Sequence, residues 1–289
     1  MQALLDSSRC SPVVRARGIT KAFESHRVLD TVDLDVYPGQ TLVIMGGSGC
    51  GKSTLLRILA GLLRPDAGRV EVFGQDLATL SGRSLDGLRL KVGVLFQSGA
   101  LFNSMTLRQN VALPLREHTS LPVPTIDIVV KMKLELVGLR QDGDKYPAEV
   151  SGGMKKRAGL ARAMALDPSL LFYDEPTAGL DPVTSAEIDQ LIIKLSRELG
   201  VTSVVVTHEM DSAFAIADQM AMLDQGRILR IDSREAFDKL RRQPPCEPAD
   251  SPTALIRQFL RGDAEGPLTA RKEASSYADD LVGGPSARP

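Results

Sequence analysis

The chain has 289 residues, of which 43% are hydrophobic and 25% are charged, as in an ordinary globular protein. Its 35 basic and 36 acidic side chains give a formal net charge of −1, so it lacks the basic excess of most nucleic-acid-binding proteins, and no nucleic-acid partner is expected. The three cysteines have neither metal-site nor disulfide-framework spacing, and no apolar run approaches the roughly 18 residues of a membrane span. The first residues lack the charged and apolar regions of a signal peptide, which predicts a cytoplasmic location.

Two stretches with strand character precede the first motif. Residues 13–17 and 34–37 are predicted to be strands, and Phe23 lies between them. The Phe23 ring has two interpretations: it stacks on an adenine base, or it is a half-buried strand side chain. Residues 1–12 are predicted to be a loose leader.

A glycine-rich segment joins the apolar run 41–45 to residues 55–59, whose apolar side chains recur at helical spacing. The segment matches the phosphate-binding pattern G-x-x-x-x-G-K-[ST] at every fixed position. Its glycines let backbone N–H groups approach phosphate oxygens, and the helix N-terminus adds partial positive charge. The predicted nucleotide-binding residues here are Gly46, Gly47, Ser48, Gly49, Cys50, Gly51, Lys52, Ser53 and Thr54. Lys52 is expected on the β- and γ-phosphates, and the Ser53 hydroxyl on Mg²⁺.

Cys50 lies inside this segment, beside Lys52 and the start of a helix. Both neighbours favour the thiolate, which predicts a reactive thiol that MgATP protects from alkylation. The alternative is a buried, inert thiol.

The middle of the chain changes from strand to helix character. Residues 69–73 and 92–96 are predicted strands, and Gln97 follows the second. A polar residue at the carboxyl end of a parallel strand faces the ligand crevice, so Gln97 is a candidate contact for Mg²⁺ or the attacking water; an exposed strand-end side chain is the alternative. Helices are predicted at 105–115, 126–137 and 154–166, which makes residues 98–166 a helical insertion.

The first part of this insertion, residues 98–118, mixes apolar side chains such as Leu101, Phe102 and Met105 with few charges. Such a surface is suited to receive a helix of a partner protein. Ordinary core packing is the alternative.

Two later strands end in polar side chains. Residues 170–173 lead into Asp174 and Glu175, and two adjacent carboxylates at the end of an apolar strand are costly unless they have a use. Next to a phosphate loop, Asp174 is expected to hold Mg²⁺ through water, and Glu175 to polarise the water that attacks the γ-phosphate; a solvated loop is the alternative. Residues 202–206 lead to His208, which either contacts the γ-phosphate or is structural.

The C-terminal part has weaker signals. Residues 218–232 are predicted to form a β-hairpin. Residues 244–289 hold seven of the 17 prolines, which predicts an extended tail that is too polar to form a core. Two apolar clusters interrupt it: Ile256, Phe259 and Leu260, which have the spacing of one helical face, and Tyr277, Leu281 and Val282.

Taken together, six motifs in this order resemble those of the ABC-type ATPases. They are the phosphate loop, Gln97, residues 150–154, Asp174-Glu175, residues 178–181 and His208. The resemblance covers residues 13–240 and implies an α/β fold of the P-loop NTPase class, ABC type. Such a fold has a mixed RecA-like sheet core, an antiparallel β subdomain and an inserted helical subdomain, here approximately residues 98–166. The expected domains are a leader (1–12), an ABC ATPase domain (13–243) and a C-terminal extension (244–289).

The same resemblance implies the site and its cofactors, ATP and Mg²⁺. It makes Glu175, His208 and Gln97 the expected catalytic residues, and Ser53, Gln97 and Asp174 the expected metal-site residues. Phe23 and Asp181 join the nucleotide-binding residues.

Residues 150–154 resemble the ABC signature, with Val150 in place of the usual Leu and Met154 in place of the usual Gln. Ser151 is expected to cap a helix whose first N–H groups are exposed by Gly152 and Gly153. Lys155, Lys156 and Arg157 lie in its first turn, where positive charge is unfavourable unless an anion binds. The resemblance implies that Ser151, Gly152 and Gly153 contact a nucleotide across a head-to-tail homodimer.

Several segments resemble more narrowly the ATPases of the Mla/Mce-type phospholipid transporters. They are residues 96–102, 110–119, 151–154, 256–260, 266–267 and 279–281. This resemblance implies a homodimer on the cytoplasmic face of the bacterial inner membrane. Its implied partners are permease subunits (MlaE-like), an Mce-domain protein (MlaD-like) and a STAS-domain protein (MlaB-like). It also implies that the C-terminal tail clasps the neighbouring ATPase.

Three other functions compete with phospholipid transport. An ABC ATPase for another substrate has the same chemistry. A soluble ABC protein that acts on ribosomes or DNA is disfavoured, because the chain carries one motif set and no sustained heptads. An inactive subunit is disfavoured because Lys52, Asp174, Glu175 and His208 are all present.

Overall fold

The computed structural model describes residues 11–244, 248 and 251–270. The chain divides into two compact units between Ile231 and Asp232, and each is described by itself. The domain boundary expected at residue 243 remains a prediction. Of the helices in the described ranges, none combines the length and apolar character needed to span a membrane.

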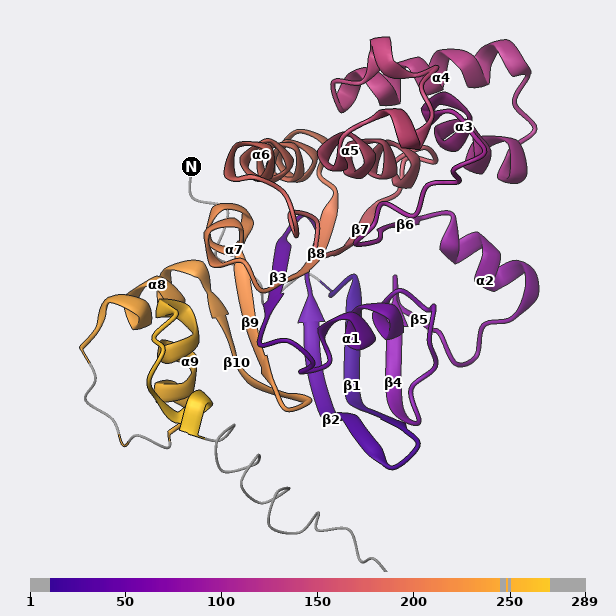
Figure 1. The fold of residues 1–289 in the computed structure, drawn as a ribbon. Helices are drawn as coiled ribbons and strands as arrows, with labels where there is room; N and C mark the ends of the chain where they lie inside the picture. Colours follow the sequence, from indigo (N-terminus) through magenta and orange to yellow (C-terminus); the bar gives the residue numbers. More distant parts are fainter. Residues whose placement is uncertain (1–10, 245–247, 249–250, 271–289) are drawn as a thin grey trace, which may run out of the picture. The chain divides into compact units, whose positions relative to one another are not determined.

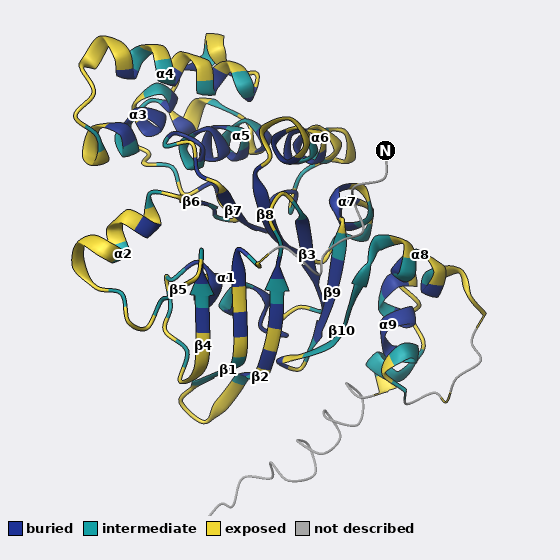
Figure 2. Cartoon of the chain, turned by 180° about the vertical axis from the view of Figure 1, so that it is seen from behind, coloured by how far each residue is buried: buried dark blue, intermediate teal, exposed yellow. Residues whose placement is uncertain are grey.

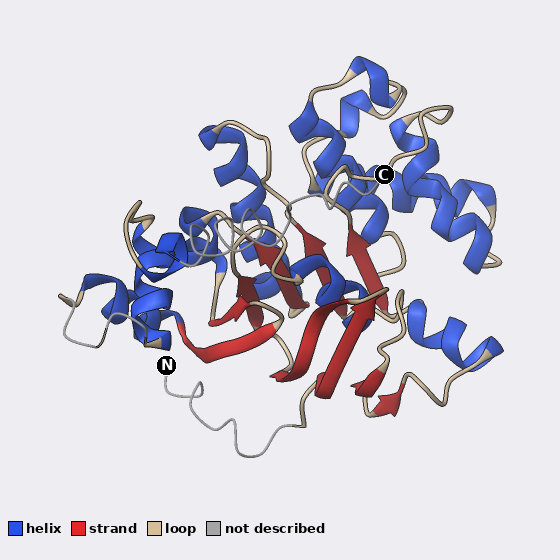
Figure 3. Ribbon diagram, turned by 60° about the horizontal axis from the view of Figure 1, so that its bottom comes forward, coloured by secondary structure: helices blue, strands red, loops and turns tan. Residues whose placement is uncertain are grey.

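A six-stranded sheet forms the centre of the first unit (Figures 1 and 3). Its strands, in spatial order, are β10 (Arg227–Ser233), β9 (Gln219–Asp224), β3 (Thr41–Met45), β8 (Thr202–Thr207), β7 (Leu170–Asp174) and β6 (Val92–Leu95). The strands from β9 to β6 are parallel, and every residue of β3, β7 and β8 is buried. This is the continuous apolar character expected of parallel strands covered on both faces. The carboxyl ends of β3, β6, β7 and β8 therefore meet at one edge.

A second, antiparallel sheet has the order β2–β1–β4–β5. It contains β1 (Val14–Phe23), β2 (His26–Val36), β4 (Ala67–Val72) and β5 (Gln75–Asp76). Helix α1 (Lys52–Leu59) lies between the two sheets, and its Leu55, Leu56 and Leu59 are fully buried in the core that the sheets share (Figure 2). The mixed sheet core with an antiparallel subdomain is confirmed.

Helices fill the segments between strands. The insertion contains α3 (Leu107–His118), α4 (Val123–Leu136) and α5 (Gly152–Ala163), which lie beside one another in Figure 1. Two short 3-10 turns, Arg140–Asp142 and Pro147–Glu149, precede α5. Pro122 and Pro124 start α4, because a proline in the first turn loses no hydrogen bond. In the first unit, the helices α2 (Gly82–Arg89), α6 (Pro182–Leu199) and α7 (Met210–Ile216) were not predicted from the sequence.

The predicted hairpin is present as β9 and β10, with Gln225 and Gly226 at its turn. Gly226 has φ +75°, and a Cβ there would lie 2.4 Å from the carbonyl oxygen of Val28, so only glycine fits.

The second unit contains two packed helices, α8 (Arg234–Arg242) and α9 (Pro252–Arg261). Leu255, Ile256 and Leu260 of α9 are at most 2% exposed. The prediction of a coreless, extended tail is wrong for this segment, because the apolar face of the helix outweighs the prolines around it; Pro252 itself occupies the first turn. Tyr277, Leu281 and Val282 lie outside the described residues.

Candidate functional site

The phosphate loop joins β3 to α1 at the carboxyl edge of the central sheet. Gly51 occupies the N-cap position with φ +106°, and a Cβ there would lie 2.9 Å from the Val28 carbonyl oxygen. No side chain caps α1, and no acidic residue lies in its first turn. The N-terminal N–H groups of α1 are therefore suited to an anion.

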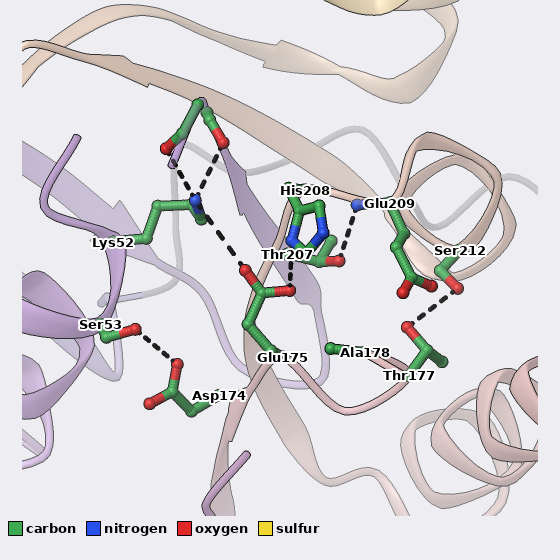
Figure 4. A network of polar contacts seen from close by, with 12 residues as sticks. Lys52, Ser53, Asp174, Glu175, Thr177, Ala178, Thr207, His208, Glu209 and Ser212 are labelled. Carbon is green, nitrogen blue, oxygen red and sulfur yellow. Dashed lines mark hydrogen bonds and ion pairs between the residues drawn. The ribbon is translucent and has the colours of Figure 1, made fainter. Parts of the chain in front are cut away.

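Lys52 is only 7% exposed and lies folded against its own loop. Its ammonium donates to the carbonyl oxygens of Gly46 and Gly47, at 2.9 and 3.0 Å. The same ammonium lies 3.9 Å from the Glu175 carboxylate. A positive charge thus stands between the phosphate loop and the end of β7 (Figure 4).

Ser53 and Asp174 face each other across the edge of the sheet. The Ser53 hydroxyl donates to Asp174 Oδ1 at 2.7 Å, and Asp174 is 4% exposed. A hydroxyl and a carboxylate at this distance supply the hard oxygen ligands that Mg²⁺ prefers, and Mg²⁺ takes few protein ligands when phosphates and water complete its shell. The pair fits the expected metal.

Glu175 occupies the centre of the site in Figure 4, between Lys52 and His208. Its Oε2 lies 2.9 Å from His208 Nδ1, and the residue is 7% exposed. Its backbone has φ +50°, a left-handed conformation that a non-glycine residue adopts at a cost of order 1 kcal/mol or more. The surrounding structure holds it there: the Glu175 N–H donates to the Val206 carbonyl oxygen on β8.

Gln97 and Phe23, two of the predicted site residues, are both exposed to solvent. Gln97 is exposed in the turn that follows β6. Phe23 is the last residue of β1, and 48% of its surface is exposed, so it is a half-buried strand side chain whose ring is still accessible to a ligand. The Lys21 ammonium lies 5.5 Å from the centre of its ring.

The signature residues form the start of α5. Ser151 is the N-cap, and its hydroxyl accepts from the Met154 N–H at 3.3 Å, as expected. Gly153 lies so close to α6 that a Cβ would meet Thr184 Cγ2 at 2.4 Å, so glycine is required there for packing as well. Ser151 and Gly152 are exposed.

Asp181 is engaged as the N-cap of α6. Its carboxylate accepts from the N–H groups of Val183 and Thr184 and from the Thr184 hydroxyl. These bonds, the hydroxyl first, lower the pKa of Asp181. This residue therefore has a structural role whether or not it contacts nucleotide.

Two sequence expectations need correction. Cys50 is 9% exposed, and burial raises the pKa of its thiol although the nearby Lys52 opposes the effect. The reactive thiolate was predicted from charge alone, and desolvation outweighs that charge. Lys156 does not present its charge to a bound anion at the start of α5: it is 5% exposed and donates to the carbonyl oxygens of Glu175 and Ala178.

The contact from Lys156 to Glu175 was missed because nothing in the spacing of the two residues indicates it. Asn110 was missed as well: it is fully buried, and its amide bonds both the N–H and the carbonyl oxygen of Phe102. The sequence signal for Asn110 is a polar residue on an otherwise apolar helix face, because a polar group that is buried there needs hydrogen-bond partners.

Comparison with known proteins agrees with this geometry. The profile of the ABC transporter family matches residues 29–178. The chain is 42% identical to the "intermembrane phospholipid transport system ATP-binding protein MlaF" of Escherichia coli strain K12, over 89% of this chain and 91% of the relative. It is also 42% identical to the "probable ribonucleotide transport ATP-binding protein mkl" of Mycobacterium leprae, over 93% of this chain and 75% of the relative.

Among solved structures, the chain resembles the dimeric ATP-binding cassette MJ0796 in a post-hydrolysis state bound to ADP and Pi. The TM-score is 0.71 and the identity 31%, over 76% of this chain and 98% of that one. With the phosphate loop, the carboxylates and the histidine assembled at one sheet edge, these matches show that the chain belongs to the ABC transporter family of ATP-binding proteins.

Proposed function

We propose that this ABC ATPase is the ATP-hydrolysing subunit of a transporter that moves phospholipids between membranes. The match to MlaF supports this assignment because it runs nearly end to end in both proteins. Ribonucleotide transport is the second candidate, on the printed description of the mkl relative, of which the chain covers a smaller share. ATP hydrolysis itself is common to both candidates.

One observation carries the proposed chemistry: the Glu175 carboxylate is held between Lys52 and His208 at the sheet edge next to the phosphate loop. Glu175 acts as the general base that orients and deprotonates the attacking water. His208 orients the carboxylate and contacts the γ-phosphate. When nucleotide binds, Lys52 exchanges the carbonyls of its own loop for phosphate oxygens, which leaves its charge opposite the base.

Ser53 and Asp174 would hold Mg²⁺, Asp174 through water, and Gln97 would add an amide oxygen. When bound, the metal neutralises charge on the phosphates. Because Ser53 already donates to Asp174, the two oxygens are in place before any ligand arrives.

Nucleotide binding uses residues at both margins of the site. The Phe23 ring, 48% exposed, supplies a stacking face for adenine. The loop residues from Gly46 to Thr54 cradle the phosphates. In a head-to-tail homodimer, Ser151, Gly152, Gly153 and Asp181 of one subunit complete the site of the other.

We assign the transporter the architecture implied by the Mla/Mce relatives. Two copies of this chain bind two MlaE-like permease subunits at the cytoplasmic face of the inner membrane. An MlaD-like Mce-domain protein and an MlaB-like STAS-domain protein are the further partners, and no nucleic acid is involved.

The role of Glu175 is tested with Glu175→Gln. The amide cannot accept the proton, so turnover should fall by about 10²–10⁴-fold while ATP still binds. The measurement is steady-state phosphate release together with equilibrium nucleotide binding. Glu198→Gln, an exposed carboxylate on α6, is the matched control and should keep full activity. Wild-type turnover in Glu175→Gln removes the base from this mechanism.

The substrate is tested on the transporter complex purified from membranes through this chain. Lipid extraction and analysis should find phospholipid retained by the complex. Phospholipid, added in detergent, should stimulate its ATPase activity, whereas uridine monophosphate should not. Stimulation by the ribonucleotide alone would favour the second candidate.

A further inference from the structure

Helix α5 contacts the loop that leaves the catalytic strand β7. The loop, residues 175–181, runs from Glu175 to the N-cap of α6. At the start of α5, a Cβ on Gly152 would lie 3.6 Å from Leu180, and one on Gly153 would meet Thr184. One turn further along the helix, Lys156 reaches the beginning of the same loop.

The Lys156 ammonium is a buried cation held by backbone oxygens. It donates to the Ala178 carbonyl oxygen at 2.7 Å and to the Glu175 carbonyl oxygen at 3.1 Å. Burial lowers the pKa of Lys156, and the negative charges of Glu209 and Glu175 oppose that effect. An ammonium has three donors, so these two carbonyls account for most of its hydrogen-bonding capacity.

The two hydrogen bonds from Lys156 hold a turn whose first residue, Glu175, has a strained backbone. Glu175 is the residue with φ +50°, and the short turn that follows it has a weak internal bond, from the Ala178 N–H to the Glu175 carbonyl oxygen at 3.3 Å. A charged donor forms stronger hydrogen bonds than a neutral one, so Lys156 is a strong restraint on this turn. The orientation of the Glu175 carbonyl in turn sets the direction in which its side chain leaves the backbone.

We propose that Lys156 is a positioning residue for Glu175: by binding the carbonyls of Glu175 and Ala178, it holds the strained turn that aims the carboxylate at the γ-phosphate. The inference rests on the proposed role of Glu175 as base. Lys156 lies on the helix that Ser151 caps. In the homodimer, the signature end of that helix serves the partner's nucleotide, while its Lys156 sets the base for its own.

The test compares Lys156→Met, which keeps the apolar stem and removes the donors, with Lys156→Gln, which keeps two N–H donors on a side chain one bond shorter. A displacement of about 1 Å at a reacting group lowers turnover by up to about 10²-fold. We expect kcat to fall by about 10–100-fold in Lys156→Met and less in Lys156→Gln, while the Kd for ATP stays within about twofold. Lys131→Met, an exposed lysine on α4, is the charge control and should keep the wild-type kcat.

A double-mutant cycle separates positioning from a general structural effect. If Lys156 acts through Glu175, Lys156→Met in the Glu175→Gln background should lower single-turnover hydrolysis no further, because the base is already absent. An equal factor in both backgrounds, or wild-type kcat in folded Lys156→Met, overturns the proposal. If Lys156→Met does not fold, the same cycle is run with Lys156→Gln. Wild-type hydrolysis in Glu175→Gln is the different result that overturns the proposed base itself.

Discussion

At the scale of single residues, Asp189 is a buried carboxylate that is not one of the proposed site residues. Asp189 of α6 is 5% exposed and accepts from the Ser212 hydroxyl at 2.8 Å; the Ser212 hydroxyl also lies 3.4 Å from that of Thr177. Its other oxygen, Oδ1, has no hydrogen-bond partner within the described part of the chain. Burial raises the pKa of Asp189 to about 6, and the negative charge of Glu209 adds to the effect.

This shift predicts a pH-dependent stability. Below about pH 4 the carboxyl is protonated in both the folded and the unfolded chain, so its ionisation does not affect the free energy of unfolding. Between about pH 4 and 6 the unfolded chain ionises first, and above pH 6 the folded chain carries the full cost of a buried charge. Asp189→Asn keeps an acceptor for Ser212 and removes that charge. It should raise the free energy of unfolding by about 1–3 kcal/mol at pH 7.5 and change it little at pH 4.

Urea unfolding at the two pH values measures this difference. Asp127→Asn, a partly exposed carboxylate on α4, is the control and should show no such pH dependence. An equal gain at pH 4 and pH 7.5 for Asp189→Asn contradicts the ionisation argument.

At the scale of elements, the loop between Gln97 and α3 is hydrogen-bonded to Asn110 and exposes the ring of Phe102. Asn110 accepts from the Phe102 N–H at 2.8 Å and donates to the carbonyl oxygens of Phe102, Met105 and Thr106. Phe102 is nevertheless 50% exposed, so the core-packing alternative does not hold for its ring. A hydrogen-bonded loop that exposes an aromatic ring is suited to receive a helix of another subunit.

Phe102→Ala should therefore separate hydrolysis from transport. In the isolated protein, basal ATPase activity and the melting temperature should stay close to wild type, because the ring contributes little to the core. In the reconstituted transporter, substrate movement per ATP hydrolysed should fall several-fold. Leu62→Ala, which removes an equally exposed apolar side chain elsewhere, is the control. Loss of folding in Phe102→Ala would show that the ring is structural after all.

At the scale of the whole molecule, the structure indicates where the C-terminal extension can be truncated. Gln258 of α9 accepts from the Leu268 N–H at 2.7 Å and donates to the Asp263 carbonyl oxygen and the Thr269 hydroxyl. Residues 263–270 thus belong to the second unit, and a truncation at 263 would leave a buried amide unpaired. A cut after Ala270 spares these bonds.

Deleting residues 271–289 tests the proposed clasp between subunits. The shortened chain should fold and bind ATP as before, but should dimerise more weakly, because a tether raises the effective concentration of the two subunits. Sedimentation and ATPase rate are each measured against dilution. In the shortened chain, the loss of dimer and of activity should begin at a higher protein concentration. A chain with a Gly-Ser segment of equal length in place of residues 271–289 should behave like the deletion. Identical dilution curves for the full and the shortened chain contradict the clasp.

The sequence by itself determined the elements whose signal is local. The phosphate loop, the strands that end at Asp174 and Thr207, and the helix capped by Ser151 all follow from spacing and composition, because a turn, a run of apolar residues and a cap are made by neighbours in the chain. The family also followed from the order of its motifs, since that order is a property of the sequence.

Tertiary structure decided what depends on desolvation and on contacts between distant segments. Beside Lys52, Cys50 resembles a reactive thiol in the sequence, yet burial gives it a raised pKa. Lys156 resembles a cation that awaits an anion, yet it binds the carbonyl of a residue 19 positions away. Helix α9 lies among prolines, yet its apolar residues Leu255, Ile256 and Leu260 are buried. In each case the free energy depends on which atoms surround a group after folding, and the local sequence does not contain that information.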